Sequence, residues 1–405
     1  MDLLENVVQP YAWGSRTAIA RLQGRPEPSP GPEAELWMGA HPQAPSRLIR
    51  AGVPLTLISA IQAAPERELG PDIARAFGGT LPFLLKVLAA ETPLSLQAHP
   101  SLDQAQEGFA RENALGIPLT APQRNYKDAN HKPELLCALT AFDALCGFRD
   151  VRETIALFGS LGVPELDPLL RPLRASPDAF GLRRTFEILM TSPAEQRAPW
   201  VARVARAARE RAEGSRFRRE LEWAARLETL YPGDPGVVGT LLLNLVQLAP
   251  GEAIYLPAGN LHAYLHGVGV EIMANSDNVL RGGCTPKHVD APELLRVLNF
   301  STGPIAPIHP LRSKDGDEVY PTPAREFRLS RASVTPADTF APARRGPELL
   351  LCTAGALEIQ AGKGDALHLR SGQSVFVSAS DPAYRVRGDG VLFRATAGDL
   401  ESGGE

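Results

Sequence analysis

Four polar side chains from three separate segments of the chain have the types expected of metal ligands. Two of them, Gln97 and His99, stand two positions apart in the stretch 95–100, SLQAHP, where polar and apolar residues alternate. Alternation is typical of a β-strand with one functional face, because successive side chains point to opposite sides. We therefore expect Ser95, Gln97 and His99 to share a face that holds a metal ion or a polar ligand.

Glu134 and His262 complete this candidate set. Glu134 follows the polar run 125–133, NYKDANHKP, and leads into an apolar strand, so its carboxylate needs a cation or hydrogen-bond donors. His262 ends the segment 251–262, whose pattern G-x5-P-x-G-x2-H resembles the second metal-binding motif of cupin β-barrels. Two imidazoles and a carboxylate suit zinc with an open position, and a glutamine in the set leaves manganese or iron as alternatives.

Further polar residues have the chemistry to handle an anion or a proton. Arg281 lies beside two glycines, which suits a backbone that approaches an anion closely, and Thr285 and Lys287 supply further donors. The alternative for this block is an ordinary polar turn. Lys86 stands alone in the apolar run 81–90, and the pKa of a lysine shifts readily on burial.

Composition limits the classes of function open to the chain. Its 405 residues are 44% hydrophobic and 22% charged, with a net charge of −4, which argues against nucleic acid as the main partner. No apolar run approaches the roughly 18–20 residues that span a membrane, and the first residues lack the pattern of a secretory signal. Four cysteines without CxxC spacing indicate free thiols, so we expect a cytoplasmic protein.

Hydrophobic periodicity predicts a mainly β protein with a helical insertion. We expect short strands over 1–60, a helical stretch at 55–78, a helix over 102–116 and mostly strand over 134–149. Three- and four-residue spacing predicts several amphipathic helices over 151–231, with arginines on solvated faces rather than on a nucleic-acid surface. Strand-like sequence resumes with VVGTLLLNLVQL at 237, residues 300–325 are loop-like, and the last five residues are expected to fray.

A faint internal repeat indicates two β units. Aligning Gly372 with Gly251 places Ala383 where the first unit has His262, so the second unit lacks the metal histidine. We therefore predict two cupin or jelly-roll-like β-barrels plus an α-helical domain. The predicted boundaries are 1–150 with 232–300 for a discontinuous catalytic unit, 151–231 for the helical insertion and 301–405 for the metal-free unit.

Together these blocks resemble the type I mannose-6-phosphate isomerases in order, spacing and detail. The matching stretches are LPFLLKVLAAETPLSLQAHP, YKDANHKPE, PAGNLHAYL and SDNVLRGGCTPK, with ELWMGAHPQAPS and AWGS in support. Members of this family are zinc-dependent aldose–ketose isomerases with a catalytic cupin barrel, a helical insertion and a second barrel without metal. The resemblance covers nearly the whole chain and implies one zinc ion held by Gln97, His99, Glu134 and His262.

The resemblance also implies a reaction, the interconversion of mannose 6-phosphate and fructose 6-phosphate. A proton moves from C2 to C1 through a cis-enediol, with Lys86, Lys132 and His131 as candidate bases. Arg281 matches the active-site arginine of the family and would neutralise the enediolate or hold the phosphate. The further residues expected at the site are Tyr264 and Asp277 for catalysis, and Trp13, Ser95, Glu271, Thr285 and Lys287 for substrate binding.

The sequence thus predicts a monomer that binds a small sugar phosphate and neither nucleic acid nor a membrane. Two other classes remain open, a non-catalytic sugar-phosphate-binding cupin and a metal-dependent cupin oxygenase. The full set of ligands and charged residues argues against the first. The glutamine argues against the second, since such an oxygenase usually has a histidine-rich iron site.

Overall fold

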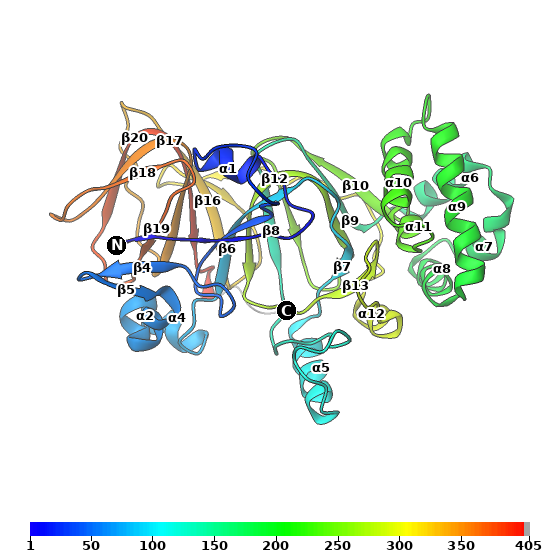
Figure 1. Ribbon diagram of the computed structural model, residues 1–405, viewed down its shortest axis with the longest axis horizontal. Helices are drawn as coiled ribbons and strands as arrows, with labels where there is room; N and C mark the ends of the chain where they lie inside the picture. The colour runs from blue at the N-terminus through cyan, green and yellow to red at the C-terminus, as the bar shows by residue number, and fades with distance from the viewer. Residues whose placement is uncertain (401–405) are drawn as a thin grey trace.

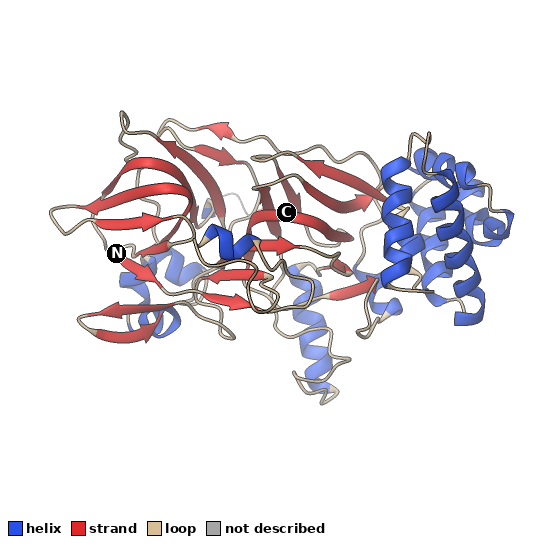
Figure 2. Cartoon of the chain, turned by 45° about the horizontal axis from the view of Figure 1, so that its top comes forward, coloured by secondary structure: helices blue, strands red, loops and turns tan. Residues whose placement is uncertain are grey.

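Two large β-sheets lie side by side in the computed structural model, which describes residues 1–400, and a group of helices covers one end (Figure 1). The chain is thus a mixture of strands and helices, as the cartoon in Figure 2 shows. The expected fraying of the last five residues lies outside the described part.

The central sheet has ten strands and is organised around one long strand, β12 (His262–Ala274). The others are β2 (Val7–Gln9), β3 (Glu35–Met38), β6 (Phe83–Ala90), β7 (Leu96–Ala98), β8 (Glu134–Ala138), β9 (Phe142–Phe148), β10 (Leu243–Leu248), β11 (Ala253–Leu256) and β13 (Leu280–Gly283). The first part of β12 pairs with β7 and β9, and its second part pairs with β6 and β8. Among the described residues these pairings close no ring, so the sheet differs from the closed barrel expected from the sequence.

The second sheet has eight strands, which come from the last third of the chain and from its first residues. They are β1 (Asp2–Leu4), β14 (Leu311–Arg312), β15 (Glu318–Tyr320), β16 (Arg328–Val334), β17 (Glu348–Ala361), β18 (Leu367–Arg370), β19 (Ser374–Val377) and β20 (Tyr384–Thr396). The pairing of β14 with β15 corrects the expectation of a loop over 300–325. A separate hairpin joins β4 (Arg47–Arg50) to β5 (Val53–Thr56).

The internal repeat has a counterpart in local structure. Gly251 and Gly372 both have left-handed backbones, with φ of 90° and 81°. Two residues after each glycine a four-residue strand begins, β11 or β19, and a thirteen-residue strand follows, β12 or β20. A glycine with positive φ lets the chain turn sharply into a strand, which explains why the two segments share it.

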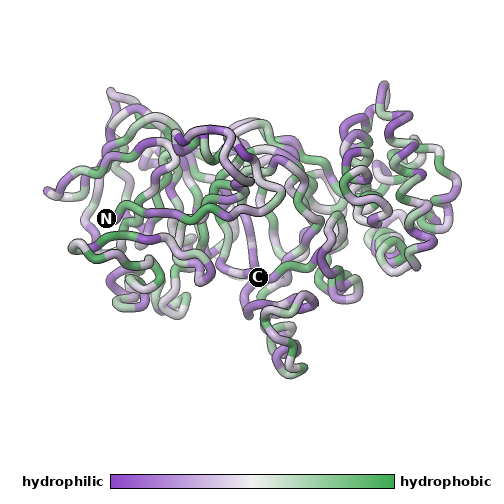
Figure 3. The backbone as a smooth tube through the Cα atoms, in the orientation of Figure 1, coloured by the Kyte–Doolittle hydropathy of each residue, from purple (hydrophilic) through white to green (hydrophobic). Residues whose placement is uncertain are grey.

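Helices fill the stretch 151–230, as its periodicity predicted. They are α6 (Val151–Leu161), the 3₁₀ turn η1 (Pro164–Leu166), α7 (Asp167–Ala175), α8 (Ala179–Thr191), α9 (Ala194–Arg211) and α10 (Arg218–Leu230). The side chains of Asp150 and Asp178 cap the amino ends of α6 and α8 by accepting backbone N–H groups. Figure 3 shows hydrophilic and hydrophobic residues mixed along these helices, which pack their apolar faces together.

The remaining helices confirm some expectations and correct others. They are α1 (Ala18–Leu22), α2 (Leu57–Ala63), α3 (Pro65–Leu69), α4 (Pro71–Ala76), α5 (Leu102–Ala114), α11 (Gly236–Thr240) and α12 (Ala291–Val297). The helix over 102–116 is confirmed, and Ser101 and Gln104 form a capping box at its start. The helical stretch 55–78 is split in three, because Pro65 and Pro71 each begin a new helix.

Residues 237–240, expected to be a strand, belong to α11. Here the side chain of Asp234 accepts the backbone N–H of Gly236 at 2.7 Å, which fixes a turn before the helix. An added Cβ on Gly236 would meet the backbone of Gly283 and Cys284, so this helix lies tightly against β13. Within residues 1–400, no helix is both long and apolar enough to cross a membrane.

One hydrophobic cluster joins the two sheets, and β8 shows how. Leu135 and Cys137 pack into a cluster that includes residues of the second sheet. The intervening Leu136 and Ala138 belong to a different cluster, which includes Tyr264. One face of β8 therefore rests on the second sheet, and the other face looks into the central sheet. The shared cluster includes Tyr320, Leu329, Leu349, Leu351, Phe376 and Phe393 from the second sheet, and Phe327, which directly precedes β16.

Candidate metal centre

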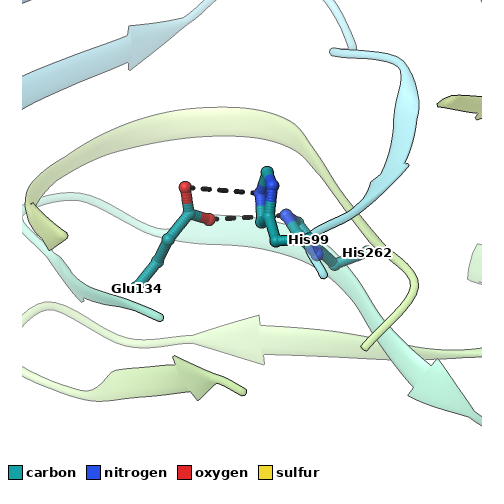
Figure 4. Close-up of side chains that lie close together, drawn as sticks. All are labelled: His99, Glu134 and His262. Carbon is teal, nitrogen blue, oxygen red and sulfur yellow. Dashed lines mark ion pairs between the residues drawn. The ribbon is translucent and has the colours of Figure 1, made fainter. Parts of the chain in front are cut away.

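Three of the four residues expected to bind metal come together inside the central sheet. The side chains of His99, Glu134 and His262 offer ligand atoms that all lie within 4.8 Å of one another. The two carboxylate oxygens of Glu134 lie 3.5 Å from Nε2 of His99 and 3.4 Å from Nε2 of His262 (Figure 4). All three side chains are almost completely buried.

The facing atoms of this cluster lack hydrogen-bond partners. Nε2 of His99, Nε2 of His262 and Oε2 of Glu134 are buried without one, which is costly for polar atoms. On the opposite side of each ring, Nδ1 of His99 lies 2.7 Å from the carbonyl of Asn278, and Nδ1 of His262 lies 3.0 Å from that of Asn260. Donation from Nδ1 leaves the lone pair on Nε2, as in metal-binding histidines, so this donor set fits zinc.

Electrostatics keep these groups in the protonation states that a metal requires. Burial lowers the pKa of His99 to about 4, so the imidazole is neutral near pH 7. Burial alone would raise the pKa of Glu134, but Lys132 and His99 hold it well below its usual value. The cluster therefore presents a neutral imidazole and an ionised carboxylate.

Gln97 lies in register beside this cluster. In the short strand β7 it pairs with His262 on one side and with Arg281 on the other. Its side chain makes no hydrogen bond to any described residue, and Ser95, just before β7, is half-buried. The structure thus places Gln97 next to His262, where its amide oxygen is the candidate for a fourth ligand.

Asn278 holds one wall of the centre in place. Its Oδ1 accepts the backbone N–H groups of Lys127 and Asp128, at 2.6 and 3.2 Å. Its Nδ2 donates to the backbone carbonyls of Asp128 and Asn130, both at 2.9 Å. The completely buried Asn278 thus ties the irregular segment 127–130 to the carbonyl that orients His99.

Lys86 lies in a buried network of charges. Its Nζ is 3.0 Å from the carboxylate of Glu271 and 3.8 Å from that of Glu35, which also accepts the indole N–H of Trp37. Burial alone would lower the pKa of this lysine, but the nearby carboxylates, first Glu271 and then Glu35 and Glu134, raise it above the usual value. Lys86 is therefore an ammonium ion at neutral pH.

Tyr264 brings a polar atom into the same interior. Its hydroxyl group is buried and has no hydrogen-bond partner, and its ring meets Phe142 edge to face. Burial, with the carboxylates of Glu271 and Glu134, raises the pKa of this hydroxyl well above its usual value. Trp13 packs, partly exposed, against the cluster that contains Tyr264. The hydroxyl is thus a neutral donor available to a ligand.

Asp277 is held by residues that the sequence analysis did not select. Nε2 of His41 lies 3.5 Å from one carboxylate oxygen of Asp277, and the side-chain amide of Gln43 donates to the other at 2.8 Å. Burial alone would raise the pKa of Asp277, but His41 and nearby lysines lower it. A carboxylate therefore stays ionised at the edge of the site.

Arg281 is a half-buried cation without a carboxylate. Its side chain makes no hydrogen bond or ion pair with any residue of the described chain, and burial lowers its pKa. Burial and Arg281 both lower the pKa of Lys287, whose backbone N–H donates to the hydroxyl of Thr285 at 3.1 Å. Two uncompensated cations near one another attract an anion such as phosphate.

Lys132 and His131 have different surroundings although they are neighbours. Nζ of Lys132 lies 3.2 Å from Oε1 of Glu134, inside the candidate metal centre. Nε2 of His131 lies 2.9 Å from Oε1 of Glu326, a residue that shortly precedes β16 of the second sheet. The structure thus brings Lys132 to the metal cluster, and it places His131 against the second sheet.

Five residues of this region were not selected from the sequence, namely Glu35, Trp37, His41, Gln43 and Asn278. The first four lie in ELWMGAHPQAPS, which was noted only as supporting the family resemblance. Polar Glu35 followed by Trp37 on the same face of a strand was a usable signal for a buried site. Asn278 gave no such signal, because asparagine is common in turns.

Comparisons with known proteins agree with this arrangement. Residues 1–151 match the family model for the catalytic domain of phosphomannose isomerase type I. The chain is 40% identical over 396 residues to mannose-6-phosphate isomerase of Escherichia coli (strain K12), covering 97% of this chain and 99% of that one. It is 34% identical over 431 residues to the same-named protein of Homo sapiens, covering 97% of each.

Solved structures of phosphomannose isomerases have the same fold as this chain. A mutant of phosphomannose isomerase from Salmonella typhimurium has a TM-score of 0.91 and 37% identity, over 98% of this chain and 100% of that one. A zinc-bound mannose 6-phosphate isomerase also has a TM-score of 0.91 and 37% identity, over 98% of this chain and 99% of that one.

Proposed function

We propose, since the chain belongs to the mannose-6-phosphate isomerase family, that it interconverts mannose 6-phosphate and fructose 6-phosphate with one bound zinc ion. The observation that carries this proposal is the buried cluster of His99, Glu134 and His262, whose facing atoms lack partners. We propose these three residues and Gln97 as the zinc ligands. A non-catalytic sugar-phosphate-binding protein, the alternative, has no observation in its favour.

The chemistry needs positive charge beside the substrate oxygens at C1 and C2, where the enediolate develops. Bound zinc supplies such a charge and can orient these oxygens. Lys86, held as an ammonium ion, and the unpartnered hydroxyl of Tyr264 are donors that we assign to the same oxygens. Glu271 fixes the position of Lys86 and lies beside the substrate in this proposal.

The proton at C2 must pass to a base, and three candidates were selected. Lys86 has no free lone pair while the surrounding carboxylates hold it protonated. The facing nitrogen of His131 is held by Glu326. These two observations leave Lys132, whose Nζ lies beside Glu134, as the remaining candidate to carry the proton between C2 and C1.

We assign the phosphate to the uncompensated cations at the other side of Gln97. Arg281 is the main partner, and Lys287 and Thr285 are further donors. We propose that Asp277 and the remaining contacts, Trp13 and Ser95, bind sugar hydroxyls. The register of Arg281 with Gln97 supports this placement, because it puts the cation beside the ligand set.

We also infer the finer layout of the chain from its family. In this layout residues 1–150 and 232–300 form a catalytic cupin-like unit, 151–231 a helical insertion, and 301–405 a cupin-like unit without metal. The shared local structure around Gly251 and Gly372 supports a duplicated unit. A monomer is the simplest assembly, and four buried free thiols fit a reducing compartment such as the cytoplasm.

An isomerase assay with and without a chelator tests the proposed function. The purified protein should convert mannose 6-phosphate to fructose 6-phosphate, lose this activity with the chelator and regain it with zinc. Absence of any activity that zinc restores would refute the proposal. Binding of mannose 6-phosphate without turnover, under the same conditions, would favour the non-catalytic alternative.

A further inference from the structure

Two strands that carry the proposed site, β6 and β8, pack one face against the second sheet. In β8 the residues of one face, Leu135 and Cys137, pack into the cluster shared with the second sheet, and Glu134 begins the opposite face. In β6, Leu85 and Val87 pack into the same cluster on either side of Lys86. Because side chains alternate along a strand, the faces of β6 and β8 that point away from Lys86 and Glu134 pack against the second sheet.

Two polar contacts fix β8 to the second sheet on both sides of Glu134. Three residues before it, His131 contacts the carboxylate of Glu326 at 2.9 Å. Three residues after it, the thiol of Cys137 donates to the hydroxyl of Tyr320 at 3.0 Å, and this hydroxyl donates to the carbonyl of Gly251 at 2.9 Å. The segment that carries Lys132 and Glu134 is thus held at both ends.

The contact at Glu326 has the greater consequence, because the segment 125–133 has no regular secondary structure to hold it. Glu326 is 9% exposed, and its second oxygen, Oε2, is buried without a hydrogen-bond partner. A carboxylate buried in this way has the ring nitrogen of His131 as its one side-chain hydrogen-bond partner among the described residues. Breaking this contact would leave both oxygens of a buried carboxylate without a side-chain partner, which is costly in free energy.

We propose that Glu326, which shortly precedes β16 of the second sheet, is a positioning residue. It holds the segment 131–134 so that Lys132 and Glu134 lie in the metal centre. The second sheet thereby affects the site without contacting substrate. This inference rests on the proposed function for its kinetic consequences, but the geometry of the segment is independent of activity.

The test compares full-length E326A, E326Q and H131F with the parent chain. Hydrogen–deuterium exchange of zinc-free protein should rise over residues 127–138 in E326A and in H131F, which removes the same contact from the other side. Zinc affinity, measured by chelator competition, should fall about tenfold in both, as for outer partners of metal ligands. E326Q keeps a hydrogen-bonding group and should stay within about threefold of the parent.

A matched control is E358A, which removes a carboxylate from an exposed His–Glu pair with His368 on the second sheet. It should leave exchange and zinc affinity unchanged. At saturating zinc, E326A should lower kcat about tenfold and change KM less than twofold, because the phosphate contacts are elsewhere. Parent-like exchange and zinc affinity in E326A and H131F, or equal losses in E358A, would overturn the proposal.

All measurements are made below the unfolding temperature of each variant. An inactive parent chain would refute the proposed function, and exchange and zinc affinity would still decide the role of Glu326.

Discussion

The ammonium group of Lys86 lies 3.0 Å from the carboxylate of Glu271, and the two residues face each other in the pairing of β6 with β12. Glu35, on the neighbouring strand β3, adds a second carboxylate at 3.8 Å. One buried cation thus compensates more than one buried anion. This balance makes Lys86 a structural requirement of the site as well as a donor within it.

The first prediction concerns this balance. Lys86→Met leaves the carboxylate of Glu271 buried without its cation, so the free energy of unfolding should fall by about 3–5 kcal/mol. Urea unfolding of the zinc-free protein measures the change. The double variant K86M/E271Q removes both charges and should be more stable than K86M alone. A double variant that is less stable than K86M would contradict the interpretation of the pair.

The second prediction concerns the proton carrier. Lys132→Met should lower kcat about 10²- to 10⁴-fold, the range for loss of a general base, and abolish exchange of the C2 hydrogen with solvent. NMR of mannose 6-phosphate in deuterated water follows this exchange. Lys314→Met, at an exposed position, is the control. Exchange that persists in K132M and disappears in K86M would transfer the role to Lys86.

The third prediction concerns Asn278. Asn278→Asp replaces the amide that donates to the carbonyls of Asp128 and Asn130. The segment 127–130 and the carbonyl that orients His99 should therefore shift. Zinc affinity, measured by chelator competition, should fall about 10- to 100-fold. Asn244→Asp is a matched control, because the amide of Asn244 also donates to backbone carbonyls. Equal losses of zinc affinity in the two variants would argue against a specific effect on His99.

The fourth prediction concerns pH. Burial lowers the pKa of His99 to about 4, whereas a histidine in the unfolded chain titrates near 6.5. Between these values the unfolded chain binds more protons, so the stability of the zinc-free protein is complete above about pH 6.5 and falls on acidification. The loss from this residue is about 3 kcal/mol by pH 4.

Urea unfolding of zinc-free protein between pH 7 and pH 4 measures this dependence. His99→Gln should remove this part of it, and His368→Gln, at an exposed position, should not. An unchanged pH dependence in H99Q would contradict the prediction.

Local sequence was a good guide to much of the fold. The helices over 151–230, the helix α5 and the strands β8 and β9 follow from periodicity and capping residues within each segment. The prediction of a strand at 237–240 was wrong, because apolar residues suit a buried helix as well as a strand. Packing against β13 decided between the two. Whether the strands form closed barrels also depends on pairing between distant segments, which periodicity does not encode.

The sequence by itself determined the chemistry available to this protein: two histidines, a glutamate and a glutamine of ligand type, and cations in separate polar blocks. Side-chain chemistry belongs to each residue, so it can be read without a structure. Only the tertiary structure decided which charges meet. The fold brings Lys86 to Glu271 and His131 to Glu326, although each pair is separated by more than 180 residues. Such contacts set protonation states and positions, because burial and neighbouring charges control both.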